Sequence, residues 1–223
     1  MSANFSITGD VGHIQLDDGR KNVINHDVLD ELEACWAEAK SNSSAVVISG
    51  RPGSFCAGYD IKVMTEGGAK AAGELGQRGG RFALELFSSE LPIIGVSQGH
   101  SFTIGAVWLA CCDIRIGESG PYKYGMTEVA LGVGFSDWPL APLRTRLKPD
   151  HLIPAILHSE LYSPEGALEA GFIDQLVAEG EAMDIAQEKA AQLAKLPRKA
   201  YAATKQVLRR KALESMANEL QPT

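Results

Sequence analysis

The chain carries S-F-C-A-G-Y-D-I-K at residues 54–62, directly after an apolar run at 45–48. The apolar run predicts a buried strand, and the glycines and proline at 50–53 predict where that strand ends. Gly58 lies among residues that can start a helix. Because glycine adopts backbone angles that other residues avoid, a turn at Gly58 can direct a backbone N–H outward. The stretch therefore predicts a strand, a glycine turn and a helix start, which together suit an oxyanion or a phosphate.

The usual nucleotide-binding loops do not explain this stretch, because the sequence contains neither G-x-x-x-x-G-K-[ST] nor G-x-G-x-x-G. The 223 residues suffice for one large domain or two small ones, and 45% hydrophobic with 22% charged residues is a globular balance. A net charge of -7 argues against a general binder of nucleic acids or of anionic membranes.

Basic residues are concentrated in the C-terminal part of the chain. We interpret them as a solvated helix face, and the alternative is a local contact for a polyanionic ligand such as a cofactor phosphate. They are Lys189, Lys195, Arg198, Lys199, Lys205, Arg209, Arg210 and Lys211.

The cysteines and the N-terminus indicate a reducing, cytoplasmic environment. The four cysteines, at 35, 56, 111 and 112, show no C-x-x-C spacing, so no zinc or other metal site is predicted. Cys111 and Cys112 lie in an apolar run and are expected to be buried. The N-terminus lacks a basic region followed by an apolar stretch, and no segment reaches the ~18 apolar residues of a membrane span.

Strands separated by helical stretches predict parallel crossovers and an α/β fold. Asn25 is the expected N-cap of a helix with one apolar face, and Ser163 with Pro164 and Gly171 predicts the start and the stop of another. The other expected strands are 5–8, 11–17, 92–97, 113–117 and 173–177, and the other expected helices are 69–88, 104–112, 181–195 and 198–218. No repeat or linker divides the chain, so we expect an α/β core at 1–160 that carries the site and a helical region at 161–223 within the same unit.

The order of four motifs resembles the crotonase (enoyl-CoA hydratase/isomerase) family. They are the stretch 54–62, I-I-G-V-S-Q-G-H-S-F-T-I-G-A at 93–106, C-C-D-I-R-I at 111–116 and Y-G-M-T-E-V-A-L-G at 124–132. In addition, D-D-G-R-K-N-V-I-N at 17–25 resembles the N-terminal acyl-CoA loop of that family. The resemblance implies a spiral of ββα units and an acyl-CoA substrate, with coenzyme A as part of the substrate and no further cofactor. It also implies a homotrimer or a dimer of trimers, with the helical C-terminal region at a subunit contact.

The resemblance further implies that two backbone N–H groups, those of Tyr59 and Ile104, form an oxyanion hole for the thioester. Chemistry beside a thioester carbonyl passes through an enolate, and each preorganised donor typically lowers the barrier by ~3 kcal/mol. Taken singly, Gly58 and Gly105 would be interpreted as ordinary turn and packing glycines. The functional interpretation is favoured because all the motifs occur in the same order as in the family. The residues that the resemblance places along the substrate and CoA are Arg20, Lys21, Ala57, Gly58, Asp60 and Gly105. Asp60 also suits the hydrogen bonds of its own loop, and Arg20 with Lys21 suits a charged hairpin turn.

One of the two catalytic glutamates of the family's hydratases is missing. Val107 occupies the place of the first, whereas Glu128 is present in the place of the second. Adding water to a double bond most simply needs two positioned groups, whereas moving a double bond can use one carboxylate that takes a proton at C2 and returns it at C4. The pattern is similar to that of Δ3,Δ2-enoyl-CoA isomerases, so Glu128 is the predicted proton shuttle. The apolar residues 129–131 are expected to desolvate it and to raise its pKa.

Asp137 is a possible second acid, with the N-cap of a helix as the alternative. A hydratase with Asp137 or another acid in place of the missing glutamate is the rival within the family, followed by a thioesterase or decarboxylase. A non-catalytic acyl-CoA-binding or RNA-binding protein is the rival from another class. His100 is interpreted as structural. Family members usually continue into further helices, so the resemblance implies that the helical C-terminal region is shortened here. The alternatives are that a neighbour's helix covers the pocket, that the pocket is more open, or that the trimer contact differs.

Overall fold

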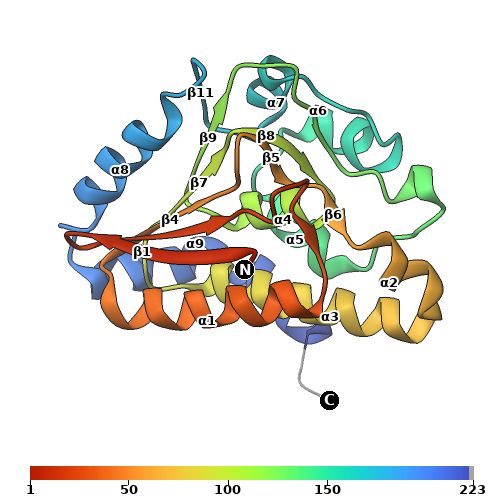
Figure 1. The fold of residues 1–223 in the computed structure, drawn as a ribbon, viewed down its shortest axis with the longest axis horizontal. Helices are drawn as coiled ribbons and strands as arrows, with labels where there is room; N and C mark the ends of the chain where they lie inside the picture. Colours follow the sequence, from red (N-terminus) through yellow and green to blue (C-terminus); the bar gives the residue numbers. More distant parts are fainter. Residues whose placement is uncertain (221–223) are drawn as a thin grey trace.

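The structure is a computed structural model that describes residues 1–220. A six-stranded sheet forms its centre (Figure 1), in the spatial order β1-β2-β4-β7-β9-β11. The first two strands form an antiparallel hairpin, and every later strand joins the sheet in parallel. The strands are β1 (Ala3–Thr8), β2 (Val11–Leu16), β4 (Ala45–Ser49), β7 (Ile93–Ser97), β9 (Ile114–Glu118) and β11 (Gln175–Val177).

Two smaller sheets stand beside the large one. In the first, β8 (Gly99–Phe102) lies between β5 (Gly53–Cys56) and β10 (Tyr124–Gly125), and in the second β3 (Val23–Ile24) pairs with β6 (Gly58–Tyr59). Three successive turns of the chain each give one strand to the large sheet and the next strand to the small one: β4 and β5, β7 and β8, β9 and β10. This spiral of ββα units confirms the predicted fold class.

Helices cover both faces of the large sheet. Figure 1 shows α1, α3 and α9 running together on one side, whereas α8 lies apart from them and packs on the other face. The helices are α1 (His26–Asn42), α2 (Ile61–Glu66), α3 (Gly68–Ser88), α4 (Ile104–Cys111), α5 (Asp137–Arg144), α6 (Pro149–Leu152), α7 (Pro164–Ala170), α8 (Ala182–Leu193) and α9 (Arg198–Glu219), with a 3-10 turn at Val129–Leu131 and a π-helical turn at Ile153–Leu157. No helix within residues 1–220 combines the length and the hydropathy needed to cross a bilayer.

The buried β4 strand separates two hydrophobic cores. Val46 and Ile48 point into the core that contains α1, α3 and α4, whereas Ala45 and Val47 point into the core under α8. This alternation follows from the two-residue period of a strand, and burial on both faces explains why the run is apolar throughout.

The α1 helix follows the sequence prediction closely. Its N-cap is Asn25, whose Oδ1 accepts a hydrogen bond from the Val28 N–H at 3.0 Å. The capped α7 helix is confirmed as well, because Ser163 accepts from the Gly166 N–H and Gly171 ends the helix with φ 97°. The expected apolar face of α1 is buried as predicted, at Val28, Leu29, Leu32, Cys35, Trp36 and Ala39.

The prediction for residues 54–62 is wrong in detail. Gly58 does not start a helix but lies in β6, with φ 104°, and α2 begins only at Ile61. Asp60 is the N-cap of α2, and its Oδ1 accepts from the Lys62 N–H at 2.9 Å. The short strand exists because Gly58 pairs with Val23, which lies far away in the sequence. The sequence pattern around residues 54–62 alone cannot predict a strand that depends on so distant a partner.

Candidate active site

The backbone N–H of Tyr59 points away from its own sheet. In the parallel pairing of β3 with β6, the Asp60 N–H donates to the Ile24 carbonyl at 2.8 Å. Neighbouring residues of a strand direct their N–H groups to opposite sides, so the Tyr59 N–H faces the side opposite to β3. The positive φ of Gly58 sets this direction. The amide is thereby left available for a ligand.

The N–H of Ile104 is the first of helix α4 and has no acceptor within that helix. Gly105 holds α4 directly against the segment that carries Tyr59. A Cβ at Gly105 would lie 2.6 Å from Cys56 Cβ and 2.8 Å from the Cys56 carbonyl oxygen, so only glycine permits this approach. The structure therefore brings together the two predicted amide donors from two successive turns of the spiral.

Glu128 has the character of a group that exchanges protons near neutral pH. Its Oε2 is buried and has no hydrogen-bond partner among the described residues. Burial raises the pKa of Glu128 from 4.5 to about 7, although the backbone N–H groups of Glu128 and Thr127 oppose this by donating to the carboxyl. The predicted desolvation is present, but its predicted source is wrong, because Val129 and Leu131 are 38% and 69% exposed.

The Tyr59 side chain links the amide donor to Glu128. Burial first, and then the charges of Cys56 and Glu128, raise the pKa of the Tyr59 phenol, which places Glu128 within electrostatic range of that ring. The Tyr59 hydroxyl donates to the Gly76 carbonyl of α3 at 3.4 Å. Val107, which replaces the other glutamate in the sequence, is 1% exposed in α4 and supplies no second acid.

The predicted CoA loop adjoins the amide donors through its backbone. The Lys21 carbonyl accepts from the Ala57 N–H at 3.1 Å, and the side chains of Arg20 and Lys21 are exposed. Asn22 was not among the residues predicted from the sequence; it is buried with φ 55° and donates from Nδ2 to three carbonyls, those of Leu16, Ser54 and Phe55. An asparagine beside a glycine turn is the signal that could have revealed it, because asparagine tolerates positive φ.

Asp137 does not suit the role of a second acid. Its carboxylate forms an ion pair with Arg144 and accepts from the Ser215 hydroxyl, and these hydrogen bonds lower its pKa. The N-cap interpretation is wrong as well, because Asp137 is the first residue of α5 and Ser136 is the cap. Instead, the Glu219 carboxylate accepts from the N–H groups of Asp137 and Trp138.

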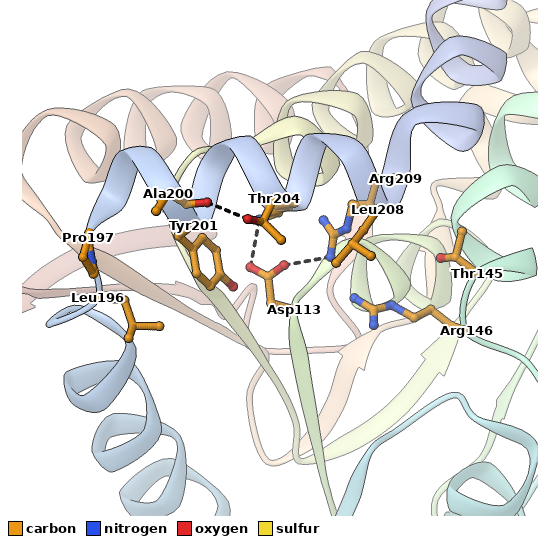
Figure 2. A pocket seen from close by; sticks show the side chains of 11 residues that line it. Asp113, Thr145, Arg146, Leu196, Pro197, Ala200, Tyr201, Thr204, Leu208 and Arg209 are labelled. Carbon is orange, nitrogen blue, oxygen red and sulfur yellow. Dashed lines mark hydrogen bonds and ion pairs between the residues drawn. The ribbon is translucent and has the colours of Figure 1, made fainter.

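A cavity of about 580 Å³ lies under α9 (Figure 2), and none of the predicted site residues lines it. Asp113, which immediately precedes β9, accepts hydrogen bonds from Lys205 and Arg209, each at 2.8 Å. Lys205 and Arg209 are only 6% and 8% exposed, so the prediction of a solvated basic face is wrong for these two residues. They hold α9 against the core, and Arg146 faces the same cavity.

The cysteines contribute to packing. All four are free thiols with buried side chains, as predicted for Cys111 and Cys112. Burial raises the pKa of the Cys56 thiol to about 12, so this thiol beside the amide donors stays protonated at neutral pH.

The ββα spiral, whose successive turns share their strands between the large and the small sheet, places the chain in the crotonase class of folds. Residues 6–221 match the model of the enoyl-CoA hydratase/isomerase family, and the chain belongs to this family. It is accordingly an enzyme of that family, for which an acyl-CoA is the fitting substrate.

Relatives within the family carry different reaction names. An enoyl-CoA hydratase structure from Mycobacterium ulcerans is similar with a TM-score of 0.94 and 29% identity, over 99% of this chain and 96% of that chain. An enoyl-CoA isomerase structure from Mycobacterium tuberculosis has a TM-score of 0.93 and 28% identity, over 98% and 96%. A carnitinyl-CoA dehydratase from Proteus mirabilis is 27% identical over 212 residues, which are 94% of this chain and 80% of the relative. Family membership thus leaves the reaction open.

Proposed function

We propose that the protein moves the double bond of an enoyl-CoA from C3–C4 to C2–C3, with Glu128 as the only proton carrier. The observation that carries this proposal is the Glu128 carboxyl, whose Oε2 is buried and whose pKa is raised to about 7, while Val107 stands in the sequence where the family's hydratases have their other glutamate. A group with that pKa is populated in both protonation states near neutral pH, so it can act first as base and then as acid.

The reaction balances without water. The Glu128 carboxylate takes one proton from C2, and the electron pair of that C–H bond delocalises through the C3–C4 double bond and the thioester to give a dienolate. The amides of Tyr59 and Ile104 donate hydrogen bonds to the enolate oxygen, each typically lowering the barrier by ~3 kcal/mol. Glu128 then returns the proton at C4, which leaves the double bond between C2 and C3.

The substrate's CoA part is proposed to follow the exposed Arg20–Lys21 loop and Ala57, where cationic side chains suit its phosphates. Gly58 and Gly105 serve by letting the two amides approach one thioester oxygen. Coenzyme A enters only as part of the substrate, and a homotrimer or dimer of trimers in the cytoplasm is the assembly that we propose.

The test is an assay of the intact protein and of Glu128→Gln with 3-enoyl-CoA and with 2-enoyl-CoA. We expect a double-bond shift without water addition, and a loss of at least about 100-fold in kcat for Glu128→Gln, because general acid–base catalysis typically contributes that much. Asp137→Asn is the matched control and should keep its activity. Rapid hydration of 2-enoyl-CoA by the intact protein, or full isomerase activity in Glu128→Gln, would refute the proposal.

A further inference from the structure

Thr103, which directly precedes α4, has a backbone conformation that is costly for threonine. Its φ is 50° and its ψ is -120°. Among residues 1–220 it is the only β-branched residue with a positive φ; the other non-glycine cases are Asn22 and Ser159. A β-branched side chain crowds its own backbone in this region, so glycine is the residue that fits here without strain. Such strain is retained where neighbouring structure enforces it, and it is common at functional sites.

Two hydrogen bonds enforce this conformation. The Thr103 N–H donates to the Gly125 carbonyl of β10 at 3.1 Å, and the Thr103 carbonyl accepts from the Val107 N–H at 3.1 Å. Gly125 lies three residues before Glu128. The backbone of Thr103 is therefore fixed between the amide-donor helix and the strand that leads to the proposed proton carrier.

The hydroxyl of Thr103 has a second unfavourable feature. Its Oγ1 is buried and has no hydrogen-bond partner among the described residues. Leaving a buried hydroxyl unpaired is costly, and such groups in native structures call for an explanation. In this respect Thr103 Oγ1 resembles Glu128 Oε2, which is also buried and unpartnered.

The position of the hydroxyl suggests what satisfies it. Oγ1 contacts Gly58 so closely that a Cβ at Gly58 would overlap it. The peptide group after Gly58 carries the Tyr59 N–H, and the peptide group after Thr103 carries the Ile104 N–H. The hydroxyl thus lies where the two residues that precede the amide donors, Gly58 and Thr103, meet. An oxygen held by both amides would also give this hydroxyl an acceptor.

We propose that the Thr103 hydroxyl is a third hydrogen-bond donor to the thioester oxygen. This inference rests on the proposed function, because it needs a thioester bound by the two amides. The O–H bond stays intact throughout: the hydroxyl donates to the carbonyl oxygen, the hydrogen bond strengthens as negative charge develops there, and no proton leaves Thr103. An interaction that is stronger in the transition state than in the ground state raises kcat more than it lowers KM.

Three substitutions at Thr103 distinguish the effect of the hydroxyl from the effect of the branched side-chain shape. Thr103→Val keeps the branching and removes the hydroxyl, Thr103→Ser keeps the hydroxyl, and Thr103→Gly removes both and relaxes the backbone. With 3-enoyl-CoA we expect about 10- to 100-fold losses of kcat for Thr103→Val and Thr103→Gly, and a loss within about threefold for Thr103→Ser. Thr204→Val on α9 is the matched control, because its hydroxyl bonds only within its own helix.

Thermal unfolding distinguishes a functional role from a structural one. If Thr103 is retained for catalysis, Thr103→Gly should lose activity while its unfolding midpoint stays equal or rises, since the strain is gone. A lowered midpoint in Thr103→Gly with wild-type kcat in Thr103→Val would show that the residue serves packing, and would overturn the proposal.

A spectroscopic readout tests the hydroxyl without relying on turnover. The probe is a conjugated aromatic enoyl-CoA, whose absorption band moves to longer wavelength when its thioester carbonyl is polarised. We expect the shift in the intact protein and in Thr103→Ser, and a smaller shift in Thr103→Val. Equal shifts in the intact protein and Thr103→Val would overturn the third donor and leave the isomerase proposal standing. A reduced shift in Thr103→Val, in a protein that does not isomerise 3-enoyl-CoA, would support the donor and refute the isomerase. No binding of the probe to the intact protein would overturn both.

Discussion

The raised pKa of Glu128 has a consequence for stability that can be measured without substrate. Its pKa is 4.5 in an unfolded chain and about 7 in the folded one. Between these values the folded chain holds a proton on Glu128 that the unfolded chain has already lost. The folded state therefore binds more protons, and its stability falls as the pH rises through this window and levels off above it.

The size of this effect follows from the two pKa values. They differ by about 2.5 pH units, and each unit corresponds to about 1.4 kcal/mol, so ionised Glu128 destabilises the fold by roughly 3 kcal/mol. About 2.5 kcal/mol of this arises between pH 5 and pH 8. Glu128→Gln cannot ionise, so it should lose this part of the pH dependence and be more stable than the intact protein at pH 8.

The assay is urea unfolding of the intact protein and of Glu128→Gln at pH 5 and pH 8, at one protein concentration. The difference between the two proteins isolates Glu128, because carboxyls with lowered pKa values, such as Asp137, contribute equally to both. Glu214→Gln, at an exposed position of α9, is the matched control. The reasoning is refuted if the intact protein and Glu128→Gln lose the same stability between pH 5 and pH 8.

Three further outcomes are expected. In the intact protein kcat/KM should rise about tenfold per pH unit up to a pH of about 7 and then level off, because Glu128 acts first as a base; a flat pH profile would contradict this. Asp113→Asn should lower the free energy of unfolding in urea by about 3–5 kcal/mol, because it leaves Lys205 and Arg209 as buried cations without their counter-charge. A loss below about 1 kcal/mol, the range of a surface ion pair, would show that these ion pairs contribute little to stability. Gly58→Ala should lower kcat by about 100-fold or more, since a Cβ with φ 104° would meet the Thr103 side chain and displace an amide donor; wild-type kcat in this variant would show that the Tyr59 amide has no part in catalysis.

Elements defined by local periodicity could be predicted from the sequence. Helix α1 is the clearest case, since its cap follows from the residue type of Asn25 and its buried positions follow from the helical spacing of the apolar residues. The stretch that carries Gly58 shows the opposite, because its β6 strand depends on a partner more than thirty residues earlier along the chain, at Val23–Ile24. A two-residue strand has no period of its own, so the sequence pattern favoured a helix start.

The partners of the charged residues could not be predicted from the sequence either. Lys205 and Arg209 lie in a basic segment that looks solvent-exposed, and only the fold shows that Asp113 meets them there. The same holds for Asp137, whose partner Ser215 lies on another helix. By contrast, Glu128 could be proposed from the sequence, because its motif occurs in order with the others. The burial of its carboxyl depends on residues outside that motif.

Helix α4 extends from the predicted amide donor to the arginines that line the cavity under α9. Its first amide belongs to Ile104, and its last carbonyls accept hydrogen bonds from Arg146, at Ala110, and from Arg209, at Cys111. Positive groups at the C-terminal end of a helix favour its dipole, whose positive end here lies at the amide donor. The Ile104 amide and the contacts to Arg146 and Arg209 thus lie at opposite ends of one eight-residue helix. Through Arg209, helix α9 therefore places a positive charge at the end of α4 that lies opposite the Ile104 amide.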